Sequence, residues 1–68
     1  MKEYKVIEIT KWGIPEEFPY KGKSLGEYTE MKINEFAKNG WKLITINNET
    51  DRDGGGPLGF TVFLEREI

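Results

Sequence analysis

One segment of this 68-residue chain has a clear helical pattern, and that segment restricts what the rest can form. Ser24 followed by Glu27 is a capping box, in which the hydroxyl accepts a backbone N–H and the carboxylate bonds back to the cap. Asn39-Gly40 is typical of a helix end, and we expect Gly40 to have a positive φ. Five residues recur at helical spacing on one side: Leu25, Thr29, Ile33, Phe36 and Ala37. A single amphipathic helix needs a sheet to pack against, so the other apolar segments are expected to be strands.

Three segments have the composition of strands. Residues 3–11 and 41–47 are rich in β-branched and aromatic residues, and residues 58–67 alternate apolar with other side chains. The helix crosses between the first two strands, which makes them parallel, and the last strand returns antiparallel. We place this last, most apolar strand in the centre. The sequence therefore predicts an α+β fold in one domain over residues 1–68: a three-stranded antiparallel sheet in the order 1-3-2, with one helix on one face.

Short stretches at the start of the chain, at the end of the helix and in the last strand, where residues 63–66 read FLER, resemble a known family. Residues 4–8 read YKVIE, residues 34–40 read NEFAKNG, and the helix exit at residues 40–44 reads GWKLI. They are similar to a family of small bacterial and phage proteins, domain of unknown function 4177, with YKVVE near the start and EGWELV at the junction. The chain departs from that pattern in its long first loop and its glycine-rich second loop. The resemblance implies a β-α-β-β fold and implies no activity and no site residues.

Composition removes several classes of function. Twelve acidic and ten basic residues give a net charge of −2, whereas general nucleic-acid binders are usually basic. The chain has no cysteine and no histidine, so a zinc–thiolate site, a thiol nucleophile and a histidine base are excluded. The lone serine, Ser24, is used as a helix cap. We therefore expect no enzyme, no cofactor and no metal. No apolar run resembles a secretory signal or a membrane span, so we expect a cytoplasmic protein without membrane contact.

Two loops carry the remaining candidate sites. Residues 12–23 present Trp12, Phe18 and Tyr20, and exposed aromatic residues are favoured anchors of protein interfaces. We interpret these three as partner-binding residues. Two alternatives are that the loop folds back over the sheet, or that it binds a small ligand or single-stranded nucleic acid beside its lysines. Residues 48–57 are acidic and then glycine-rich; they match the first half of a calcium loop but have Phe60 at the required glutamate position, so we expect a mobile, solvated loop.

One helix covers only one face of a sheet, which leaves a second face to explain. The expected helix side carries Tyr4, Val6, Trp41, Leu43, Phe60, Val62 and Leu64. The opposite face then carries Ile7, Ile9, Ile44, Ile46 and Phe63, which is more apolar than a soluble monomer usually exposes. Three alternatives remain for what covers this face: a second copy of the chain, the folded-back loop, or another protein. We expect a homodimer through this face, and a non-enzymatic module that acts by occupying a protein partner.

Overall fold

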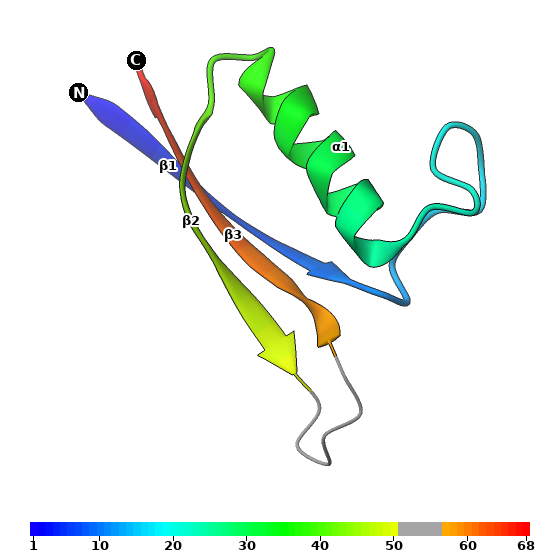
Figure 1. Ribbon diagram of the computed structural model, residues 1–68. Coiled ribbons are helices and arrows are strands. Elements are labelled where there is room, and N and C mark those ends of the chain that lie inside the picture. Colours follow the sequence, from blue (N-terminus) through cyan, green and yellow to red (C-terminus); the bar gives the residue numbers. More distant parts are fainter. Residues whose placement is uncertain (51–56) are drawn as a thin grey trace.

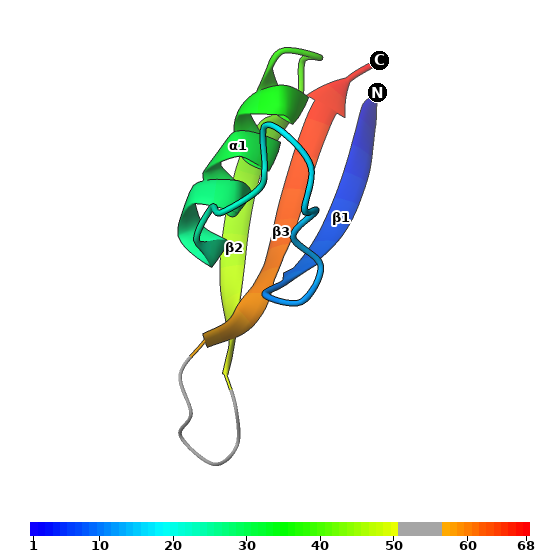
Figure 2. The same ribbon diagram turned by 90° about the vertical axis from the view of Figure 1, so that its right-hand side faces the viewer.

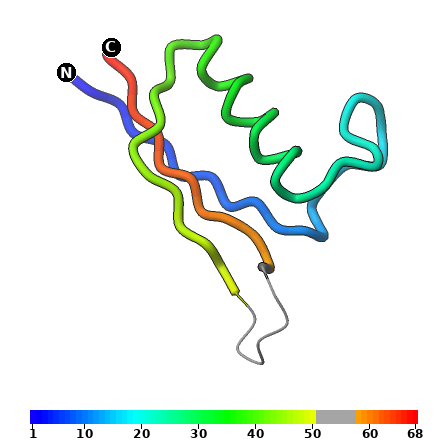
Figure 3. The backbone as a smooth tube through the Cα atoms, in the orientation of Figure 1, coloured from blue at the N-terminus to red at the C-terminus, as the bar shows by residue number. Residues whose placement is uncertain are grey.

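The chain forms a three-stranded sheet with one helix against one of its faces (Figure 1). The structure is a computed structural model that describes residues 1–50 and 57–68. Strand β1 spans Lys2–Thr10, helix α1 spans Leu25–Ala37, strand β2 spans Lys42–Thr50 and strand β3 spans Pro57–Glu67. The strand order is β1-β3-β2, and β3 is antiparallel to both neighbours, as the path of the backbone in Figure 3 shows. The predicted α+β fold and its central last strand are confirmed.

Both ends of α1 are fixed by residues that the sequence indicates. The backbone N–H of Glu27 donates to Ser24 Oγ at 3.2 Å, and the Ser24 N–H donates to Glu27 Oε1 at 3.1 Å. At the other end Gly40 has a φ of 87°, so its predicted positive φ is confirmed. The N–H of Trp41 donates to the Phe36 carbonyl oxygen at 3.1 Å, which closes the last turn. This bond ties the end of the helix to the start of β2.

The buried core lies between α1 and the sheet. Val62 and Leu64 of the central strand are 0% and 1% exposed. The buried hydrophobic cluster of the described residues consists of Ile9, Trp41, Val62 and Leu64. Partly buried side chains around it are Ile7, Leu25, Tyr28, Ile33, Phe36 and Phe60. A cluster this small is what a chain of this length can build, and it leaves little stability in reserve.

Strand β1 turns toward the helix the face that was expected on the other side of the sheet. Residues that pair directly across antiparallel strands share a face, and Ile7 and Ile9 pair with Val62 and Phe60. They therefore face α1, and the prediction that they lie on the far side is wrong. Ile46 also pairs with Val62 and faces the helix. The expected face would place the Glu8 carboxylate beside the helix, whereas the observed face places Lys5 there, with its ammonium over the Phe36 and Trp41 rings.

The alternate residues of β1, Tyr4 and Val6, lie on the side of the sheet away from the helix. Tyr4 and Val6 were expected on the helix side, but Val6 pairs with Phe63, and both strands alternate about the buried positions. Tyr4, Val6 and Phe63 therefore face away from α1. We call this side of the sheet the open face. Phe63 is the one residue of the five expected on the far side that the regular pairing places there.

The second and third strands extend farther than expected. The predicted loop began at residue 48, but β2 continues to Thr50, with Asn48 opposite Phe60 and Glu49 opposite Gly59. Gly59 has no side chain where β1 and β3 approach closely: a Cβ there would collide with the carbonyl oxygen of Ile9. The acidic and glycine-rich residues of the predicted loop, residues 51–56, lie outside the described residues.

The segment from β1 to α1 lies on the same side of the sheet as the helix. Figures 1 and 2 both show it in the helix layer, with none of the described segments on the opposite side. Its backbone is folded by local turns, in which the Tyr20 N–H donates to the Glu17 carbonyl and the Lys23 N–H donates to the Tyr20 carbonyl. The backbone of the loop therefore leaves the open face uncovered, and the Trp12 side chain borders that face at the end that carries Glu8 and Thr61.

Candidate functional site

The three aromatic residues of the first loop have different surroundings. Trp12 and Phe18 are 73% and 93% exposed, whereas Tyr20 is partly buried. The Tyr20 ring meets Tyr28 of α1 edge to face, with 5.2 Å between ring centroids. Trp12 borders a hollow at the ends of the strands, beside Gly59 and Thr61, and Tyr20 lies elsewhere, on the helix. The structure thus separates the three predicted partner-binding residues into two exposed side chains, Trp12 and Phe18, and one residue, Tyr20, that attaches the loop to the helix.

The attachment of the loop includes a polar network on α1. The Tyr20 hydroxyl donates a hydrogen bond to Glu35 Oε1, and Lys32 Nζ lies 2.9 Å from Glu35 Oε2. The hydrogen bond to Glu35 raises the pKa of Tyr20. The hydrogen bonds from Tyr20 and Lys32 lower the pKa of Glu35. These groups stabilise one another at neutral pH.

Two cations, Lys5 and Arg66, lie over the aromatic residues at the end of the helix. Lys5 Nζ is 5.3 Å from the Trp41 ring centroid and 5.7 Å from that of Phe36. The guanidinium carbon of Arg66 is 4.4 Å from the Trp41 ring centroid, and Arg66 Nε also donates to Glu3 Oε1 at 2.7 Å. These long side chains cover the rings with their apolar stems. We interpret the cluster as a shield of the core rather than as a binding site.

The open face has an apolar centre. Tyr4 and Val6 of β1 are 65% and 58% exposed, and Val6 lies opposite Phe63 of β3. On the other side of Phe63, β2 contributes Thr45. We call Tyr4, Val6 and Phe63 the apolar stripe. It crosses two neighbouring strands, and none of the described residues covers it.

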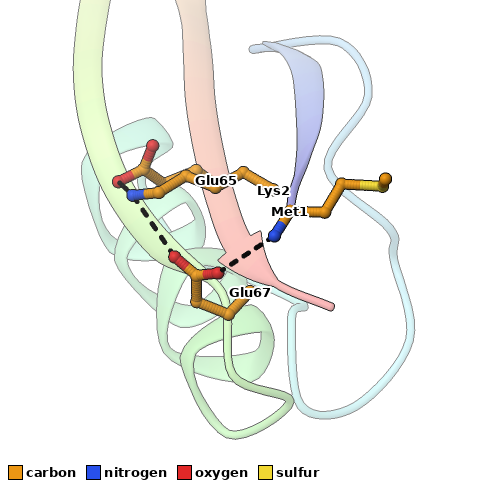
Figure 4. Close-up of polar contacts among 4 residues, drawn as sticks. All are labelled: Met1, Lys2, Glu65 and Glu67. Atoms are coloured by element: carbon orange, nitrogen blue, oxygen red, sulfur yellow. Dashed lines mark hydrogen bonds and ion pairs between the residues drawn. The ribbon is translucent and has the colours of Figure 1, made fainter.

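The two ends of the open face differ in charge. At the end near both termini, Lys2 Nζ lies 3.2 Å from Glu65 Oε1 and 3.7 Å from Glu67 Oε1 (Figure 4). The terminal amine of Met1 lies 3.8 Å from the Glu67 carboxylate, and Lys42 lies opposite Glu65 on β2. At the far end the register places Glu8, Thr61 and Asn47 in one row, followed by Thr10, Gly59 and Glu49. One end therefore carries Lys42 beside compensated charges, and the other end carries carboxylates.

A bulge places Ile44 outside the regular pairing. Leu43 lies opposite Leu64 and Thr45 lies opposite Phe63, so Ile44 is the additional residue of β2 between them. Its side chain is 51% exposed. The five residues expected to form one self-association face therefore divide: three face α1, Phe63 joins the open face, and Ile44 occupies the bulge.

The sequence analysis did not predict a groove that lies beside α1. The groove lies between α1 and β2, and Gly26 of the helix lines it. A glycine inside an amphipathic helical pattern is the signal that could have indicated it. Within residues 1–50 and 57–68, no group of three or more metal-ligating side chains comes together, and no helix has the length and apolar character to span a bilayer.

Comparison with known proteins identifies the family. A family model described as domain of unknown function (DUF4177) matches residues 2–67. No curated protein and no solved structure matches the chain. The matched region includes all four secondary-structure elements, from β1 to the last residue of β3. The chain therefore belongs to the DUF4177 family.

Proposed function

We propose that this chain is a non-enzymatic interaction module that forms a homodimer through the open face of its sheet. The observation that supports the proposal is the position of the helix and the loop: both lie on one side, and the apolar stripe lies on the other (Figures 1 and 2). Exposed Tyr4 and Val6 lose unfavourable contact with water when a second copy covers them. A small core gains most from such cover.

The distribution of charge suits a second copy of the same chain. A two-fold axis parallel to the sheet and perpendicular to the strands places one end of the open face over the opposite end of its partner. Lys42 of each copy then meets the end that carries Glu8 and Glu49 in the other copy. The apolar stripes meet near the centre. The same patch is thus complementary to itself in both charge and polarity.

The size of the face sets the expected strength of the dimer. Three strands about 4.8 Å apart and about 30 Å long present roughly 400 Å² per copy. Stable specific interfaces bury about 800 Å² per partner, so this interface belongs to the small class. We therefore expect a dissociation constant in the micromolar range, with monomer and dimer exchanging as concentration changes.

Light scattering across a concentration series tests the proposal with a matched pair of variants. Val6→Lys places a charge in the apolar stripe, and it should shift the protein toward the monomer because burying that charge is costly. Ile68→Lys adds the same charge at a residue of similar exposure, 67%, beyond the end of β3. It should leave the mass unchanged. A parent that stays monomeric, or equal behaviour of the two variants, would contradict the proposal.

A second candidate function uses the first loop, and it is favoured by the exposure of Trp12 and Phe18. Lys11 Nζ lies 5.0 Å from the Trp12 ring centroid, so a cation and an aromatic surface stand side by side. Single-stranded nucleic acids are bound by such pairs. Titration with an oligonucleotide tests this candidate: a salt-sensitive change in fluorescence that Trp12→Ala abolishes would support it, and no change would leave the loop as an anchor for protein.

A further inference from the structure

The groove between α1 and β2 is apolar inside and open to one side. It has a volume of about 270 Å³. Its lining residues are Gly26, Thr29, Glu30, Ile33, Asn34, Ile46 and Phe60. The hydroxyl of Thr29 already donates to the Leu25 carbonyl oxygen at 2.8 Å. The inner surface therefore consists chiefly of Ile33, Ile46 and Phe60, with Glu30 as the charged group at its side.

Gly26 lines this groove without a side chain that could fill it. A Cβ built at Gly26 has no neighbouring heavy atom within 4 Å, and the residue does not have the positive φ found at Gly22 and Gly40. Neither close packing nor backbone conformation therefore requires glycine here. Glycine within a helix lowers stability relative to alanine. The structural consequence of having it at this position is space beside the helix, next to the edge of β2.

The two edge strands of the sheet are protected to different degrees. On β1, Lys5 points toward the helix side, and an inward-pointing lysine is one of the devices that prevent pairing at an edge. On β2, every residue is exposed, and the charged residues are Lys42 and Glu49, near its two ends. The central residues of β2 carry no charge. The edge beside the groove is thus the less protected of the two by charge, and the bulge at Ile44 interrupts it near one end.

We propose that the groove and the edge of β2 together bind an extended segment of another protein. The segment adds a strand to β2, and its side chains on the helix side enter the groove. One such side chain is apolar and contacts Ile33 and Ile46. Two positions along, on the same side, a basic residue meets Glu30, which forms no ion pair within residues 1–50 and 57–68.

The occupant is another protein rather than a second copy paired with this one through β2. The segment that this edge and groove fit requires a basic residue on the helix side. The helix-side residues of β2 itself are Leu43, Ile46 and Asn48, which include none. This inference goes beyond the proposed homodimer and does not depend on it.

A displayed library of random heptapeptides tests the proposal. Peptides are selected on the parent and counter-selected on Gly26→Leu, whose side chain fills the groove. Gly26→Ala is the matched control, because it makes the same gain in helix propensity and adds only one carbon. Both variants should melt at or above the temperature of the parent, so lost binding cannot reflect unfolding.

The expected winners have β-branched residues and a lysine or arginine two positions from an apolar residue. A labelled winner should bind the parent and Gly26→Ala alike, and Gly26→Leu and Glu30→Lys at least about tenfold more weakly. The β2 amides that do not bond to β3 should become protected from hydrogen exchange. Enriched peptides that bind Gly26→Leu as well as the parent, or no enrichment, would overturn the proposal.

A further variant separates this inference from the proposed homodimer. Val6→Lys should bind the selected peptide normally while losing self-association. If Gly26→Leu instead abolishes self-association and Val6→Lys does not, a second copy occupies the edge of β2. That result would overturn both the peptide proposal and the open-face dimer.

Discussion

The two faces of this sheet come from the same three strands, yet only one of them is a protein core. On the helix side, Val62 and Leu64 are almost completely buried, because α1 and Trp41 lie over them. On the open face, Phe63 lies between them in sequence and joins the exposed Tyr4 and Val6. The helix side is apolar along most of its length, whereas polar and charged residues flank the apolar stripe on the open face. The comparison shows that the alternating set richer in apolar residues becomes the core, and that the apolar stripe is the part of the other set that resembles it.

The largest effect is expected from truncating a residue on the buried face, and the same truncation on the open face provides the comparison. Leu64→Ala should lower the free energy of unfolding by about 2–5 kcal/mol, because it removes a buried side chain and leaves a cavity. Phe63→Ala should cost less in dilute solution, because the open face is uncovered in the monomer. Urea unfolding at low protein concentration measures both. If Phe63→Ala costs as much as Leu64→Ala, the two faces are equally buried and the comparison fails.

The next effect concerns the attachment of the helix to the sheet. Gly40→Val forces a branched side chain into a positive φ, and it should cost about 1–3 kcal/mol. It should also increase the solvent exposure of Trp41, because the Trp41 N–H is part of the helix end. Urea unfolding and fluorescence quenching check the two effects. A loss of only a few tenths of a kcal/mol would show that the helix side does not depend on this end of α1.

A smaller effect is expected at the start of the helix. Ser24→Ala removes the acceptor for the Glu27 N–H and should cost about 0.5–2 kcal/mol. Ser24→Asp is the control, because aspartate also caps helices and should retain most of the stability. Thermal unfolding of the three proteins provides the measurement. Equal loss in both variants would indicate a role for Ser24 other than capping.

The smallest effect is a pH dependence on the helix side. Hydrogen bonds from Ser24 lower the pKa of Glu27, and hydrogen bonds from Tyr20 and Lys32 lower that of Glu35. Groups with lowered pKa values stabilise the fold above their ordinary pKa of 4.5, and that stabilisation is lost as the pH falls below it. Tyr20→Phe should raise the pKa of Glu35 in a carbon-13 NMR titration and leave that of Glu27 unchanged. An unchanged Glu35 would show that the loop is not attached through this bond.

The sequence predicted the elements and their order because local signals are strong in this chain. The Ser24 cap, the Gly40 turn and the alternation in residues 58–67 each follow from local chemistry. The face of β1 could not be fixed in the same way, because Val6 and Ile7 are adjacent and either can face the helix. Charge did not decide between them, because Glu8 lies on the same side as Val6 and Lys5 lies on the same side as Ile7.

The groove and the bulge depend on how distant residues meet. Ile44 leaves the regular pairing because Leu43 and Thr45 pair with the consecutive residues Leu64 and Phe63, which leaves Ile44 without a partner position on β3. No local sequence pattern shows this. The separation of Tyr20 from Trp12 likewise follows from the contact of Tyr20 with α1, which is distant in the chain. The space beside Gly26 exists only because β2 passes next to the helix. Such features follow from tertiary packing, which periodicity does not encode.

The most direct test of the open-face dimer is an isotope-filtered NMR experiment on a mixture of labelled and unlabelled protein. At millimolar concentration, the methyl groups of Val6 in one copy should show contacts with the rings of Tyr4 or Phe63 in the other. Those contacts should disappear on dilution together with the larger mass. A mass that remains that of one chain, or intermolecular contacts confined to other residues, would contradict the account.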